Sequence, residues 1–112
     1  MRINSEEAAL IRKTIDTASR GEWSIFRELS DEPFLNESAM QEQFEMASVE
    51  IRSMSNPKTT ASLQRGPKGS RMIYVDVVDK NTSSKRVQVI LHSVVKEDGC
   101  KIGIWVFAPM PN

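Results

Sequence analysis

The stretch RVQVILHSVV, residues 86–95, decides the fold class of this chain. It is dominated by valine, isoleucine and leucine, and its composition and length predict a long β-strand. Asp98-Gly99 follows shortly afterwards, and this dipeptide is the strongest β-hairpin signal in the sequence. The next apolar segment, Ile102 to Phe107, is therefore predicted to pair with it as the last antiparallel strand, before Pro109 and Pro111 end regular structure.

Two further strands are predicted upstream of this hairpin. Met72 to Val78 is a β-branched run between the turn GPKG at residues 66–69 and the polar turn DKNT at residues 79–82. Thr59 to Gln64 shows a weaker alternation. Four consecutive strands joined by short turns predict one antiparallel sheet.

The first half of the chain has the period of helices instead. Asn4 or Ser5 is expected to cap a first helix that ends at Gly21, and Ser38 with Gln41 forms a possible capping box for a third. A short second helix lies between them, and Asn56-Pro57 ends the third. The apolar positions of the three are Ala8, Ile11, Ile15 and Ala18; Trp23, Phe26 and Leu29; and Met40, Phe44, Ala47, Ile51 and Met54.

The predicted fold class is therefore α+β: three N-terminal helices packed on a curved four-stranded antiparallel sheet, as a single domain over residues 1–112. Fifteen basic and fifteen acidic side chains cancel, so no basic excess favours nucleic acid, and no apolar run is long enough for a membrane helix. One cysteine excludes an internal disulfide, and the N-terminus lacks the apolar region of a signal peptide. These features weakly favour a cytoplasmic protein.

Alternation along each strand divides the sheet into two faces. One face is expected to meet the helices, and it holds Ile73, Val75, Val77, Val87, Val89, Leu91, Val95, Ile102, Ile104 and Val106. The other face holds Met72, Tyr74, Asp76, Gln88, Ile90, His92, Val94, Gly103, Trp105 and Phe107. A solvent-facing side should be mostly polar, and this one is not. We therefore expect a second protomer, a partner or strong sheet curvature to cover it.

The order of elements resembles the nuclear-transport-factor-two-like (cystatin-like) superfamily, a cone of helices on a curved sheet. Two local stretches carry the resemblance: Ile15 to Trp23, where an aspartate and then Gly21-Glu22 lead into a short second helix, and Glu97 to Ile102, which resembles the final hairpin. Trp105 departs from the pattern, because the aromatic residue usually follows the turn glycine directly. The resemblance implies a possible pocket inside the cone and a sheet-mediated dimer, but no particular reaction.

Candidate catalytic residues are Asp16, Asp76 and His92. Asp16 lies near the end of the first helix, where a solvated carboxylate is the simpler interpretation. His92 and Asp76 lie on neighbouring strands, and an imidazole near a carboxylate can act as a general acid–base pair. One histidine with scattered carboxylates lacks the spacing of a metal site, and no cofactor is expected.

The binding or interface candidates are Met72, Tyr74, Ile90, His92, Trp105 and Phe107. The leading hypothesis is a non-catalytic, bacterial-type binding or interaction module that homodimerises through this sheet face. One alternative is a small-molecule isomerase or hydrolase with its pocket between helices and sheet. Another is an accessory or immunity-type protein that caps a partner with the same face. A small apolar ligand is a further possible partner, whereas nucleic acid and membranes are not expected.

Overall fold

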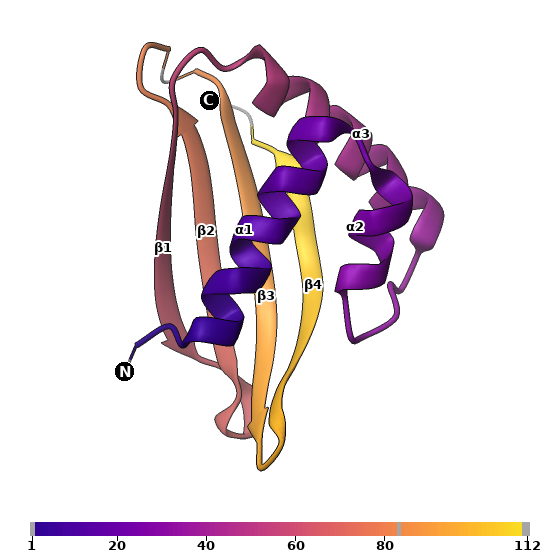
Figure 1. Ribbon diagram of the computed structural model, residues 1–112, viewed down its shortest axis with the longest axis vertical. Coiled ribbons are helices and arrows are strands. Elements are labelled where there is room, and N and C mark those ends of the chain that lie inside the picture. The colour runs from indigo at the N-terminus through magenta and orange to yellow at the C-terminus, as the bar shows by residue number, and fades with distance from the viewer. Residues whose placement is uncertain (1, 83, 111–112) are drawn as a thin grey trace.

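The computed structural model describes residues 2–82 and 84–110, and its elements follow the predicted order. The fold class is confirmed as α+β, with three N-terminal helices and an open antiparallel sheet in the order β1-β2-β3-β4 (Figure 1). The helices are α1 (Ser5–Arg20), α2 (Trp23–Leu29) and α3 (Glu37–Ser53), and the strands are β1 (Pro57–Arg65), β2 (Arg71–Asp79), β3 (Arg86–Lys96) and β4 (Gly99–Pro109). A 3₁₀ turn, η1 (Pro67–Gly69), joins β1 to β2.

Short polar residues set the ends of the helices. Asn4 caps α1, because its side chain accepts a hydrogen bond from the N–H of Glu7 while the Glu7 carboxylate accepts one from the N–H of Asn4. Gly21 ends α1 with φ of 68°, the left-handed conformation that glycine adopts without strain. The prediction for α3 was wrong: Asn36, not Ser38, is the cap and accepts from the N–H of Ala39 at 3.0 Å.

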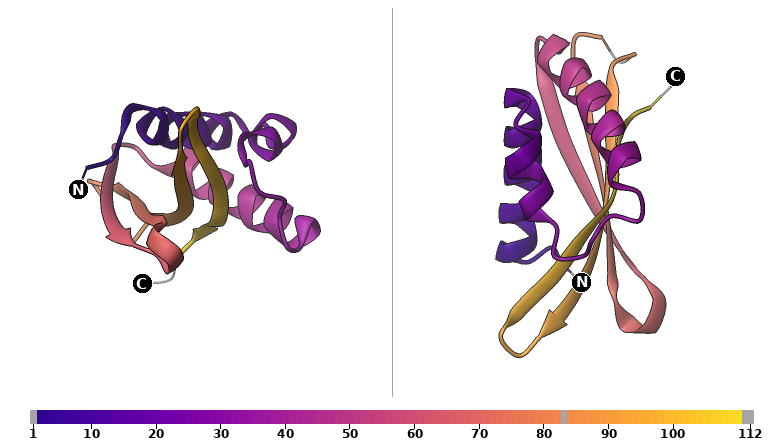
Figure 2. Two further views of the ribbon diagram at one scale, coloured as in Figure 1. Left: turned by 90° about the horizontal axis from the view of Figure 1, so that it is seen from below. Right: turned by 90° about the vertical axis from the view of Figure 1, so that its right-hand side faces the viewer.

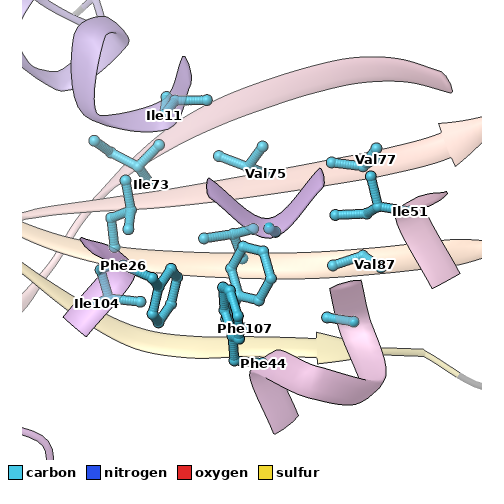
Figure 3. Packing of buried hydrophobic residues seen from close by; sticks show 14 of the residues in the cluster. Ile11, Phe26, Phe44, Ile51, Ile73, Val75, Val77, Val87, Ile104 and Phe107 are labelled. Atoms are coloured by element: carbon cyan, nitrogen blue, oxygen red, sulfur yellow. The ribbon is translucent and has the colours of Figure 1, made fainter. Parts of the chain in front are cut away.

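The inner face of the sheet, defined as the face that packs against the helices, carries the hydrophobic core. Its fully buried side chains include Ile73, Val75 and Val77 on β2 and Val87, Val89 and Leu91 on β3. Figure 3 shows Phe26, Phe44 and Phe107, which come from three different elements, close together over β3 and β4. Phe26 of α2 lies 4.5 Å from Phe44 of α3 and 5.0 Å from Phe107 of β4, measured between ring centroids. Aromatic rings therefore fill the space between the helices and the sheet, where the superfamily resemblance implied a possible pocket.

A β-bulge reverses the predicted faces along the second half of β4. The partners of Ile90 and Leu91 on β3 are Val106 and Ile104, which leaves Trp105 as the extra residue. Phe107, predicted on the outer face, is therefore fully buried in the core, and Val106, predicted to face the helices, lies on the outer face. Val95 was also predicted on the helix-facing side, but it is 58% exposed near the β3–β4 turn.

The two edges of the sheet differ in how they are covered. Along β1, every residue except Leu63 is exposed, and α2 and α3 lie at the opposite edge (Figure 1, Figure 2). The N–H of Lys80 donates to the carbonyl of Asn56 at one end of the β1–β2 ladder, and the N–H of Gly66 donates to the carbonyl of Ser70 at the other. Even-numbered residues of β1 therefore bond to β2, and the odd-numbered ones direct their backbone groups to the free edge.

Candidate functional site

The connection after α2 covers the free edge of β4. The N–H of Asp31 donates to the carbonyl of Ile102 at 2.8 Å, and the Asp31 carboxylate accepts from the N–H of Ile102 at 2.8 Å. Two residues further along β4, the Ser30 hydroxyl accepts from the N–H of Ile104 at 3.0 Å, and it donates to the carbonyl of Glu32 at 2.7 Å. These four hydrogen bonds fix the backbone of residues 30–32 against β4, and they place Glu32 beside the outer face of the sheet.

Glu32 forms a polar cluster with His92 and Trp105, which we call the Glu32 cluster. One carboxylate oxygen accepts from the indole N–H of Trp105 at 2.8 Å, and the other lies 3.1 Å from Nδ1 of His92. The imidazole stacks on the indole with ring centroids 4.5 Å apart. Gly103 makes room for this arrangement, because a Cβ at that position would lie 2.0 Å from a Glu32 carboxylate oxygen and 2.9 Å from its Cβ.

Two hollows border the Glu32 cluster. The larger, which we call the β4 groove, has a volume of about 710 Å³ between the start of α3 and β4. The second, of about 560 Å³, lies between η1 and the side chains of His92, Val94 and Trp105. The β4 groove is lined by Glu32, Pro33, Phe34, Leu35, Asn36, Ala39, Met40, Gln43, Ile104, Trp105 and Val106. Its volume is within the range of small-molecule sites.

The three predicted catalytic residues do not come together. Asp16 is exposed on α1, where it forms an ion pair with Arg20. Asp76 lies on the outer face and pairs with Arg86 at 3.0 Å. In the strand register Asp76 is opposite Gln88, whereas His92 is opposite Met72, so the two side chains are four residues apart along the ladder. The hypothesis of an acid–base site made by Asp16, Asp76 and His92 between helices and sheet is therefore wrong.

The predicted interface residues occupy three different environments. Tyr74, Ile90 and Val106 are in register across β2, β3 and β4, and they form a half-buried apolar row on the outer face. Val94 and Trp105 extend this row, and we call the five residues together the outer patch. Met72 has the predicted outer-face parity but is 8% exposed, because the turn at Gly66 packs over it. Phe107 belongs to the core, as described above.

Two buried carboxylates, Glu7 and Asp79, were not among the predicted site residues. Glu7 is fully buried in α1 and forms a two-pronged ion pair with Arg71, at 2.7 and 2.9 Å. Burial by itself would raise the pKa of Glu7, but the hydrogen bonds from Arg71 and from the N–H of Asn4 outweigh it and hold the pKa below its usual value. The pair of Glu7 with Arg71 joins residues 64 positions apart, so no local motif marks it, whereas the bond with the N–H of Asn4 belongs to the capping box of α1.

Asp79 is the second buried carboxylate, and it ties the α3–β1 connection to the end of β2. It accepts hydrogen bonds from the backbone N–H groups of Ser55, Asn56 and Asn81, each at 3.0 to 3.1 Å. Burial would raise the pKa of Asp79, but these N–H groups and the charge of Lys85 lower it overall. Asp79 therefore has a structural role in place of the simple turn position that its sequence context indicates.

The described residues contain no group of three or more histidine, cysteine, aspartate or glutamate side chains placed to hold a metal ion. None of the helices in the described ranges has the length and apolar character needed to cross a membrane. A scan against models of protein families, a search of curated proteins and a search of solved structures found no match. The resemblance to the nuclear-transport-factor-two-like superfamily accordingly stays a prediction.

Proposed function

We propose that this protein is a non-catalytic interaction module that homodimerises through the outer patch. The observation that carries the proposal is the continuous apolar row of Tyr74, Ile90 and Val106 across three strands. α1 lies against the inner face, and α2 and α3 lie at the β4 edge of the sheet (Figure 1, Figure 2), so Tyr74 and Ile90 have no helix above them and stay half-buried. A half-buried apolar surface of this kind on an antiparallel sheet is typical of a binding surface.

The surroundings of the row favour a specific contact over nonspecific adhesion. On one side lies the ion pair of Asp76 with Arg86, and on the other lies the Glu32 cluster. An apolar centre with polar groups around it is the usual organisation of a protein–protein interface. Two copies of such a surface can meet about a two-fold axis, which is the commonest symmetry of protein dimers.

The proposal predicts the effect of one charge on the solution mass. The parent chain should have a mass near twice 12.6 kDa by light scattering, and Ile90→Glu should reduce it to that of a monomer, because two carboxylates would be buried at the interface. Thr59→Glu adds the same charge on the opposite side of the sheet and should leave the mass unchanged. Tyr74→Arg, at the position that pairs with Ile90, provides a second disruptive variant if Ile90→Glu folds poorly.

A further variant separates the outer patch from the free edge of β1. The backbone N–H of Ala61 points to this edge, so Ala61→Pro removes a donor that an edge-paired dimer would use while it leaves the β1–β2 hydrogen bonds in place. We expect no change in mass. A monomeric parent would contradict the proposal, and so would a dimer that resists Ile90→Glu and Tyr74→Arg but is lost in Ala61→Pro. Copurification with a different protein would favour the alternative of a capping protein.

A further inference from the structure

The β4 groove has one charged side chain among the described residues that line it, the carboxylate of Glu32. Most of the other lining side chains are apolar, including Phe34, Met40 and Trp105, and two are neutral amides. A ligand that fills this space therefore meets an apolar surface with a negative group at one end. Such a surface is complementary to an apolar molecule that carries a positive charge.

The charge of Glu32 is not neutralised by a lysine or an arginine within the described ion pairs. Its two hydrogen-bond partners are the indole N–H of Trp105 and Nδ1 of His92, and the imidazole carries a positive charge only in its protonated form. Each carboxylate oxygen accepts one of these bonds and keeps a further lone pair for a ligand. The side chain is 32% exposed, so a ligand can reach it from the groove.

Trp105 supplies a second attraction for a cation. Its indole is held at one edge by Glu32 and against the imidazole of His92, yet 47% of the residue remains exposed. The face of an aromatic ring attracts a positive charge, and tryptophan does so most strongly. The Glu32 carboxylate and the Trp105 indole are already in place in the free protein, because Gly103 leaves room for Glu32 and hydrogen bonds fix residues 30–32 against β4. Little conformational entropy is therefore lost when a ligand binds.

The N-terminal end of α3 also borders the groove, and a helix N-terminus favours anions. Here the side chain of Asn36 already accepts from the N–H of Ala39, which satisfies one of the free donors. The remaining partial charge of the helix end is smaller than the full charge of Glu32. We propose that the β4 groove binds a small organic amine, with its ammonium group on Glu32 and its apolar part against Trp105 and Phe34. Trp105 and Val106 belong both to this groove and to the outer patch, so the charge preference is measured in Ile90→Glu, the variant designed to be monomeric, as well as in the parent.

Three probes of nearly equal size test the charge preference. They are phenethylammonium, 2-phenylethanol and 3-phenylpropanoate, titrated while the ¹⁵N-labelled indole N–H signals are followed by NMR. The Trp105 signal should shift most, and the Trp23 signal should shift less because Trp23 does not line the groove and reaches it only through Phe34. We expect the ammonium to bind at least about tenfold more tightly than the alcohol, the size expected of one charge-assisted hydrogen bond, and the carboxylate to bind most weakly.

Two matched variants assign this preference to one carboxylate. Glu32→Gln should reduce the ammonium-to-alcohol affinity ratio to about one, while its unchanged affinity for 2-phenylethanol shows that the groove is intact. Glu37→Gln, at an exposed carboxylate that pairs with Arg27, should leave the ratio as in the parent. The proposal is overturned if none of the probes moves the Trp105 signal, if the alcohol or the carboxylate binds as tightly as the ammonium, or if the preference survives in Glu32→Gln. Ile90→Glu should keep the ammonium-to-alcohol affinity ratio of the parent, which separates this test from that of the dimer.

Discussion

The inner and outer faces of strands β2 to β4 both carry apolar side chains, but the two sets differ in how deeply they are buried. On the inner face, three helices add Phe26, Phe44 and their neighbours, and side chains such as Val75 and Leu91 are completely buried. On the outer face, Tyr74 and Ile90 have no helix above them and stay half-buried. The difference shows that alternation locates apolar residues, whereas the helices decide which of them become core. The apolar residues of the outer face, which no helix covers, are the strongest indication of a binding surface.

The largest expected effect comes from two neighbouring residues on opposite faces of β4. Phe107→Ala should lower the free energy of unfolding by roughly 3–5 kcal/mol, because it leaves a cavity beside Phe26 and Phe44. Val106→Ala, one residue earlier and on the outer face, should cost about 1 kcal/mol or less in the monomer. Urea denaturation of an Ile90→Glu background measures both. Equal losses would contradict the assignment of the bulge and of the two faces.

A smaller effect is expected at the buried ion pair on the helix side. The pKa of Glu7 is lowered in the folded state, so its ionised form stabilises the protein above the unfolded value near 4.5, and this contribution is lost as the pH falls through the folded pKa. Glu7→Gln should lower the free energy of unfolding at neutral pH by roughly 1–3 kcal/mol, because Arg71 loses its charged partner.

The pH dependence of the Glu7→Gln variant provides the check. The free energy of unfolding of the variant should fall less than that of the parent as the pH is lowered below about 5. It should still fall to some extent, because the pKa of Asp79 is also lowered in the folded state. Thermal unfolding over a pH series measures this difference. Parallel curves for parent and variant would mean that Glu7 is not the carboxylate whose ionised form is stabilised on folding.

The smallest change in stability is expected at Gly103, under the Glu32 cluster. A Cβ at this position forces the Glu32 side chain away from the sheet. Gly103→Ala should therefore break the hydrogen bond from Trp105 and shift its indole N–H signal upfield, while it changes the free energy of unfolding by only about 1 kcal/mol. An unshifted Trp105 signal would show that Glu32 does not need this gap.

The sequence was sufficient to predict the elements and their order, because helical and strand periods change clearly between the two halves. It was not sufficient to place Phe107 on the correct face, because the extra residue Trp105 in the bulge reverses the face to which every later side chain of β4 points. The cap of α3 was missed because Asn36 and Ser38 are both good capping residues. The Glu32 cluster joins residues 60 and 73 positions apart, which no local pattern records, although a glycine inside a predicted strand was a sign of close approach.

The most direct test of the outer patch as a self-association surface is its protection from solvent. Methyl signals of Ile90 and Val94 can be compared with that of Leu63 on β1 in the presence of a soluble paramagnetic chelate. We predict that the methyl signals of Ile90 and Val94 show little paramagnetic relaxation at protein concentrations where the mass is doubled, and strong relaxation after dilution to the monomer. The relaxation of the Leu63 signal should be the same at both concentrations. Equal relaxation of Ile90 and Val94 at every concentration would contradict the proposal that this face is an interface.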